Sequence, residues 1–174
     1  MTYQAENLDE WFPRDGSGRP LNAASGERLG VVVGGSLSKG LVVKVDAAQS
    51  IEHLAVGRYV VVHGQDKRFF CMVTDIELNT TNQSIQNNPP EMTDPFLRDV
   101  YGGTVAYGTV HVAPMLSIEA DGTPKPVKTI PSHFTRVVNA TEEDVNDVFG
   151  AEDETHFNVG APLELEHTQI NLNL

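Results

Sequence analysis

The chain has 174 residues, of which 40% are hydrophobic, and a formal net charge of −12. It has no apolar run long enough to span a membrane, no basic and apolar leader at its start, and one cysteine, which excludes an internal disulfide framework. These features predict a cytoplasmic protein with a single main domain and long excursions, and no association with membranes.

The negative charge is concentrated at the end of the chain. Residues 139–174 carry nine acids and no Lys or Arg, whereas residues 27–83 carry six acids and six bases. An acidic block repels phosphate groups, so the chain alone is a poor candidate for binding nucleic acid.

Residues 1–26 are polar and rich in turn-forming residues, which predicts an irregular N-terminal arm. Trp11 and Phe12 are its exceptions. They are interpreted either as an anchor that docks the arm onto the body or as a motif that binds a partner.

Residues 27–138 are predicted to form a mainly β domain. Valine-rich segments follow one another, separated by glycine and charged turns: RLGVVVGGS, GLVVKVD, RYVVVHG, RFFCMVTDIEL, GTVAYGTVHVAPMLSIE and HFTRVVN. This pattern is typical of a small antiparallel barrel or meander, here with about six to seven strands. The two-residue spacing of valines predicts that one set faces a common core: Val31, Val33, Val43, Val45, Val60 and Val62.

A long insertion loop interrupts this domain at residues 80–103. Polar residues and Pro89, Pro90 and Pro95 dominate it, and one helical turn is expected at residues 95–100.

Residues 139–174 are predicted to form an acidic helix and a linker strand. Thr141 can act as the N-cap, acids fill the first turn, Val145, Val148 and Phe149 share one face, and Gly150 supplies the stop. The acids of EEDVND are interpreted as a solvated helix face.

The closing strand is expected over residues 163–174. Its apolar positions change phase around residues 167–169, so Leu163 and Leu165 are expected to close the barrel. Residues 170–174 are expected to be an exposed stump at the junction with an absent following domain, either free or paired with a neighbouring copy.

The sequence predicts no catalytic residue, no cofactor site and no metal site, and therefore no enzyme activity in this chain. Its histidines are scattered without metal-ligand spacing: His53, His63, His111, His133, His156 and His167. The glycine-rich segment 34–40 lacks the Gly-Lys-Ser/Thr order of a phosphate loop and is interpreted as a hairpin connection. Cys71, in an apolar strand, is interpreted as a buried thiol rather than as a nucleophile.

Several of these segments together resemble a known family. They are Gly30 with its valine strand, VGRYVVV at 56–62, MVTDIEL at 72–78, and the element from Gly160 to Leu163. The series resembles the N-terminal barrel of HerA-like ATPases, the HAS barrel, which rotary ATP synthase subunits share. The resemblance covers residues 27–174, and the arm through Glu27 has no counterpart in it.

The resemblance implies a hexameric, ATP-driven DNA translocase that works with a NurA-like nuclease on DNA ends. In such proteins the barrels form a crown and contribute to contacts between subunits and with partners, while ATP and Mg belong to the following ATPase domain. The expected partners are therefore the chain's own C-terminal ATPase domain, neighbouring subunits and a NurA-like nuclease, with DNA bound only by the full-length assembly.

The sequence leaves two other functions open. One is an OB-like nucleic-acid-binding barrel, for which Tyr59, Phe69 and Phe70 are the available aromatics on a neutral barrel. The other is a small enzyme of the split-barrel flavin type, which would need a cluster of anion-binding residues.

Overall fold

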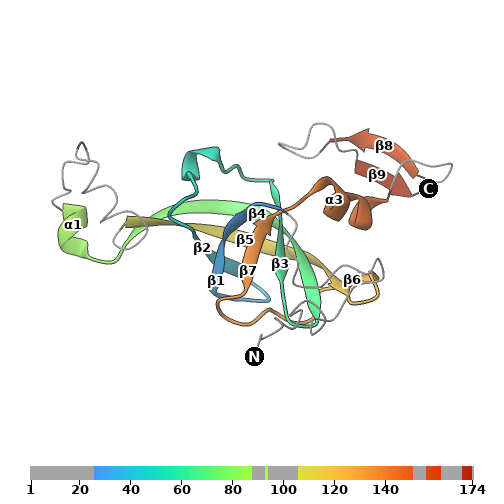
Figure 1. Cartoon of the computed structure of the whole chain (residues 1–174), viewed down its shortest axis with the longest axis horizontal. Helices are drawn as coiled ribbons and strands as arrows, with labels where there is room; N and C mark the ends of the chain where they lie inside the picture. Colours follow the sequence, from blue (N-terminus) through green and yellow to red (C-terminus); the bar gives the residue numbers. More distant parts are fainter. Residues whose placement is uncertain (1–25, 88–92, 94–105, 151–155, 162–169, 174) are drawn as a thin grey trace, which may run out of the picture.

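The computed structural model describes residues 26–87, 93, 106–150, 156–161 and 170–173 of the chain (Figure 1). The arm with Trp11 and Phe12, the helical turn expected at residues 95–100, and Leu163 and Leu165 lie outside the described residues. Among the helices that the structure describes, none is long and apolar enough to cross a membrane.

Six antiparallel strands close a barrel. They are β1 (Arg28–Ser36), β2 (Gly40–Val45), β3 (Tyr59–His63), β4 (Lys67–Thr80), β5 (Ala106–Glu119) and β7 (Arg136–Asn139). The order around the ring is β1, β7, β3, β4, β5 and β2, and the pairing of β2 with β5 completes it. The prediction of a mainly β fold with a small antiparallel barrel is confirmed.

A seventh strand, β6 (Pro124–Pro126), pairs with β5 outside the ring. Proline is tolerated on an edge strand, where its missing N–H is not needed for pairing.

The interior of the barrel is apolar. Its buried residues are Leu29, Val32, Leu41, Val43, Val45, Val60, Val62, Phe69, Cys71, Val73, Val110, Val112 and Val137. Four of the six valines predicted to face one core are in this set, but Val31 and Val33 are only half-buried and are not.

The predicted phase of β1 is wrong because the strand is irregular. Opposite β7, Arg28 pairs with Val138 and Gly30 with Val137, so Leu29 is an additional residue on β1. A second register shift follows between Val32 and Gly34. Such bulges change which side chains face the core, and alternation counted from the sequence does not detect them.

The far ends of β4 and β5 form a ribbon that projects beyond the barrel (Figure 1). The two strands remain paired as far as Thr80 and Ala106. Helix α1 (Gln83–Asn87) lies at the tip, and Leu78 on the ribbon is 81% exposed. A 3₁₀ turn, η2 (Ile51–His53), lies in the connection between β2 and β3.

The C-terminal segment forms a separate two-stranded sheet. Strand β8 (His156–Gly160) pairs antiparallel with β9 (Ile170–Asn173). The expectation of an exposed stump is therefore wrong for residues 170–173, since this strand has a partner within the chain. Helix α3 (Glu142–Phe149) precedes this sheet and lies next to β9.

Candidate functional site

Helix α3 is specified by its own sequence. Thr141 Oγ1 accepts a hydrogen bond from the Asp144 N–H at 3.3 Å, and the Asp144 carboxylate accepts one from the Thr141 N–H at 3.0 Å. This reciprocal pair is a capping box, which satisfies amides that the first turn leaves without partners. Gly150, with φ of 77°, ends the helix as predicted.

The helix packs against the outside of the barrel and covers a second apolar cluster. Its buried members are Val61, Phe70, Ile118, Val138, Ala140 and Val145. Tyr59 and Phe149 border them, and the Phe70 ring centroid lies 4.9 Å from that of Tyr59 and 6.1 Å from that of Phe149. The outer faces of β3, β4 and β7 are thus buried under α3.

A buried ion pair fixes the helix at the edge of this cluster. Arg68 Nη1 on β4 lies 2.8 Å from Asp144 Oδ1, and the two side chains are 4% and 1% exposed. Arg68 Nη2 also lies 3.3 Å from Asp147 Oδ2, on the more exposed side of the helix. Asp144 therefore serves both the helix cap and the contact with the barrel.

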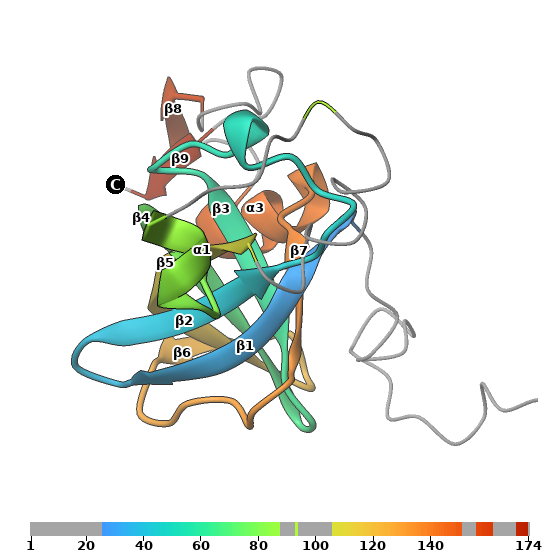
Figure 2. The same cartoon turned by 90° about the vertical axis from the view of Figure 1, so that its left-hand side faces the viewer.

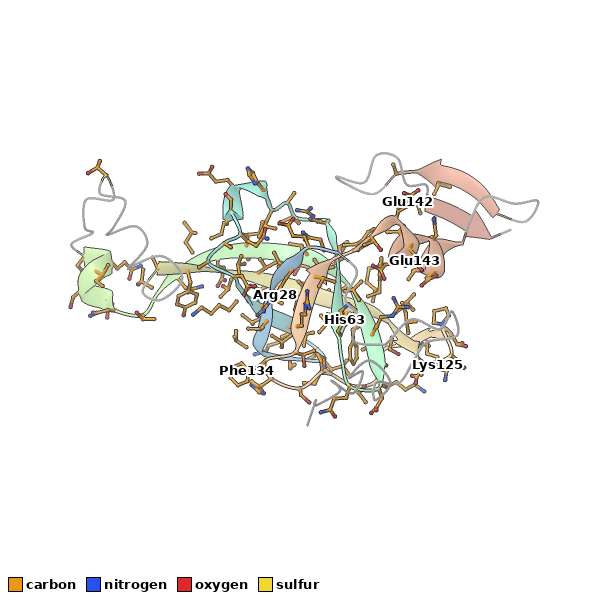
Figure 3. All side chains as sticks on the ribbon, viewed as in Figure 1. Arg28, His63, Lys125, Phe134, Glu142 and Glu143 are labelled. Carbon is orange, nitrogen blue, oxygen red and sulfur yellow. The ribbon has the colours of Figure 1, made fainter. Side chains whose placement is uncertain are left out.

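The interpretation of the EEDVND acids as a solvated face is wrong for Asp144. Glu142 and Glu143 are exposed, as expected, and Figure 3 shows both at α3. Asp144 points the other way because Arg68, 76 residues earlier, supplies a buried positive charge. Nothing local to the helix sequence indicates this partner.

A different part of the outer surface is open among the residues that the structure describes. Outward-facing residues of β2, β4 and β5 line an open groove of about 420 Å³. Lys44 Nζ lies 4.5 Å from the Tyr107 ring centroid, His111 Nε2 lies 3.4 Å from Glu77 Oε2, and Asn79 Nδ2 donates to Thr109 at 2.8 Å. The groove's polar groups mainly satisfy one another, and no nucleophile and base are paired in it.

Comparison with known protein families gives a match over residues 29–128, to the HAS barrel domain. The chain belongs to the HAS-barrel family. The matched residues contain five of the six barrel strands, from Leu29 in β1 through β5, together with β6. No curated protein gives a significant match to the sequence.

The glycine-rich segment of this HAS barrel is a hairpin connection, as predicted. Ser36 pairs with Gly40 at the end of β1 and β2, and the Lys39 N–H donates to Ser36 Oγ at 3.1 Å. Gly35 and Gly40 have φ of 128° and 83°, and a Cβ on Gly40 would lie 2.6 Å from the Val112 carbonyl oxygen. The turn and the close approach of β5 account for both glycines.

Cys71 lies inside the HAS barrel, and the prediction that it is buried is confirmed. Its Sγ lies 3.5 Å from the Phe69 carbonyl oxygen, and burial raises the pKa of the thiol far above its ordinary value. A thiol in this setting keeps its proton, which disfavours nucleophilic chemistry.

The described histidines are dispersed over the HAS barrel. His53, His63, His111 and His133 lie on four different segments, and His156 begins β8. His111 Nε2 lies 3.4 Å from Glu77 Oε2. Among the described residues, no three His, Cys, Asp or Glu side chains come together in a way that could hold a metal ion. His167 lies outside the described residues.

Sequence reasoning found neither Arg68 nor Asp144. The apolar runs of β3, β4 and β7 (VVV, FFC and VV) gave no usable signal, because β1 and β2 contain similar runs (VVV and LVV) although alternate positions in them are only half-buried.

Proposed function

We propose that this chain is the non-catalytic N-terminal barrel of a HerA-like hexameric DNA translocase ATPase. In that role it serves the assembly of subunits in the cytoplasm and docks a NurA-like nuclease for the processing of DNA ends. The observation that supports this proposal is the HAS-barrel match over residues 29–128, because this domain is known from HerA-like ATPases.

The docked helix gives the proposal a structural basis. Helix α3 continues directly from β7, and the Arg68–Asp144 pair holds it on the barrel. A segment that leaves a barrel through a fixed helix has a defined direction, which suits a domain that must be oriented on a ring of subunits.

We further propose that the chain itself neither binds nor hydrolyses ATP. Phosphate loops present backbone amides and a Lys-Ser/Thr pair at the start of a helix. In this chain the glycine-rich segment with Lys39 instead joins two strands. ATP and Mg would then belong to the ATPase domain of the complete assembly.

An OB-like role in binding nucleic acid is a second candidate. The groove places Lys44, Tyr107 and His111 on the outer face of a barrel, which is where OB folds bind single strands. However, Glu77 lines the same groove, and its carboxylate would repel phosphate. The assembly role is therefore the better supported of the two.

The decisive experiment is a binding assay with the NurA-like nuclease encoded in the same genome. We expect the purified chain to retain this nuclease in a pull-down, and fluorescence anisotropy to detect no binding of a labelled single-stranded oligonucleotide at physiological salt. Absence of nuclease binding, both by the chain and by the product of its complete reading frame, would refute the docking role. Oligonucleotide binding that a Lys44→Ala substitution abolishes would favour the second candidate.

The gene offers an independent check. We expect the reading frame that encodes this barrel to encode a GxxxxGK[ST] motif a few dozen codons beyond Leu174. A complete frame without this motif would refute the assignment to a HerA-like ATPase.

A further inference from the structure

One end of the barrel carries an exposed apolar loop between β6 and β7. This end loop, residues 127–135 together with Arg136 at the start of β7, crosses the barrel beside the turn between β3 and β4 (Figure 2). Its side chains Ile130 and Phe134 are 44% and 74% exposed. Figure 3 shows Phe134 at the lower edge of the barrel, away from α3.

The backbone holds Phe134 in an unusual conformation. Its φ is 63°, a value that bulky residues rarely adopt and that costs on the order of 1–3 kcal/mol. The Phe134 N–H donates to the Val32 carbonyl at 2.7 Å, and the Thr135 hydroxyl donates to the Ser132 carbonyl at 2.6 Å. These bonds fix an aromatic ring in solvent, where no described residue buries it.

A small hollow lies next to the end loop. It measures about 130 Å³ and is lined by residues 129–132 of the end loop, by residues 64–67 around the β3–β4 turn and by Phe69. Phe69, Ile130 and Pro131 supply the apolar part of a mostly polar lining, and the volume is close to the roughly 150 Å³ of a cavity that accommodates benzene, which suits part of an aromatic side chain.

The end loop is also basic. Lys128 and Arg136 are exposed, and within the described part of the chain neither forms a salt bridge. Residues 122–141 contain no Asp or Glu, although the whole chain has a net charge of −12. One acid, Asp66, lines the hollow together with Lys67. An acidic segment with aromatic side chains would therefore complement both the positive charge and the exposed apolar side chains of this surface.

We propose that residues 6–12 of the same chain, ENLDEWF, bind the end loop. This segment has three acids followed by Trp11 and Phe12. The aromatic side chains cover Phe134 and Ile130 and enter the hollow, and the acids face Lys128 and Arg136. The proposal does not depend on the function proposed above.

The chain is long enough for this contact. Fourteen peptide bonds separate Phe12 from Gly26, where the described residues begin, and fully extended they would span about 45 Å. The distance along β1 from Gly26 to Val32, whose carbonyl accepts the hydrogen bond from Phe134, is only about 20 Å. A coil of this length has a root-mean-square span of about 20 Å, which gives a high effective concentration at the end loop.

Trp11 is the only tryptophan of the chain, so its fluorescence reports this contact directly. In the native full-length chain we expect its emission at shorter wavelength than in the guanidinium-unfolded chain. The Phe134→Asn substitution should move the native emission at least half of the way to the unfolded value. Asn tolerates positive φ, so this variant should keep its fold, which circular dichroism would verify.

The matched control is Leu78→Asn, which removes an exposed apolar side chain from the projecting ribbon and should leave the emission unchanged. A Phe134→Asn emission identical to that of the wild type, or a native emission already equal to that of the unfolded chain, would overturn the proposal. A red shift on dilution of the wild type would also overturn it, because a second copy would then supply the segment.

Discussion

Val60, Val61 and Val62 are consecutive and fully buried, yet they belong to two different environments. Val60 and Val62 point into the barrel, whose buried residues are all apolar, whereas Val61 lies in the outer cluster under α3. The interior is enclosed by the strands, with Leu54 and Val127 from two loops packed against it. The outer cluster depends on a helix that a buried ion pair helps to hold in place. Val60 and Val61 are therefore equally buried for two different physical reasons, and different substitutions should destabilise the two environments.

The largest effect is expected in the interior. Val60→Asp would bury a carboxylate without a partner, at a cost of several kcal/mol against a total stability of roughly 5–15 kcal/mol. We expect this variant to be unfolded by circular dichroism at 25 °C. Val56→Asp, at a position that is 55% exposed, is the control and should fold. A Val60→Asp protein with the wild-type melting temperature would show that the Val60 side chain is not buried.

The outer cluster should be broken by Asp144→Ala. This change leaves Arg68 buried without its partner and removes the capping box, and we expect a loss of about 3–5 kcal/mol in urea denaturation. Glu142→Ala, in the same turn but exposed, should cost less than about 1 kcal/mol.

The double variant Arg68→Met/Asp144→Leu sharpens the comparison. Replacing a buried ion pair by apolar side chains is often neutral or stabilising, so the double variant should be markedly more stable than Asp144→Ala alone. Equal losses for the single and double variants would mean that the cap, rather than the ion pair, holds the helix.

A smaller effect is expected from Cys71, and it depends on pH. Burial raises the pKa of its thiol from an ordinary value of 9.0, so the folded chain keeps the proton at pH values where the unfolded chain loses it. Stability should therefore be constant below pH 9 and fall above it, by at most about 1.4 kcal/mol per pH unit. Urea denaturation at pH 8 and pH 10 would measure this, and Cys71→Ala should show a weaker decline over the same interval.

The smallest effect is expected in the groove, which is open within the described part of the chain. Lys44→Ala removes the contact with the Tyr107 ring, which at an exposed site contributes about 0.5–1 kcal/mol. Lys39→Ala, in the exposed β1–β2 turn, should be neutral. A loss above about 2 kcal/mol for Lys44→Ala in urea denaturation would show that this face is a third core.

The strands of the barrel could be predicted because each contains a run of valine or aromatic residues bounded by turn formers. The cap of α3 could also be predicted, since Thr141, Asp144 and Gly150 act within a few residues of one another. The core-facing residues of β1 could not be predicted, and Val31 and Val33 were chosen in place of Leu29 and Val32. A bulge is a property of two paired strands and leaves no regular pattern in the sequence of one of them.

The Arg68–Asp144 pair was beyond sequence reasoning for a related reason. The two residues are brought together only when α3 lies on β4, and a charged residue beside an apolar run looks the same whether it is solvated or buried. The pairing of β8 with β9 was missed because the closing strand was predicted over residues 163–174 and no strand was predicted over residues 156–160. In each case the missing information is a contact between distant segments.

The position of β7 in the ring has a consequence for how the protein is made. β7 lies between β1 and β3, although more than seventy residues separate it from the end of β3. While the ribosome is still synthesising the chain, the facing edges of β1 and β3 have no partner until Asn139 has left the exit tunnel. Folding rates fall as contacts become less local, so the barrel should close late and slowly, on a millisecond-to-second scale. During that interval two valine-rich edges are open to other nascent chains, and chaperones that shield such edges should raise the yield of folded protein.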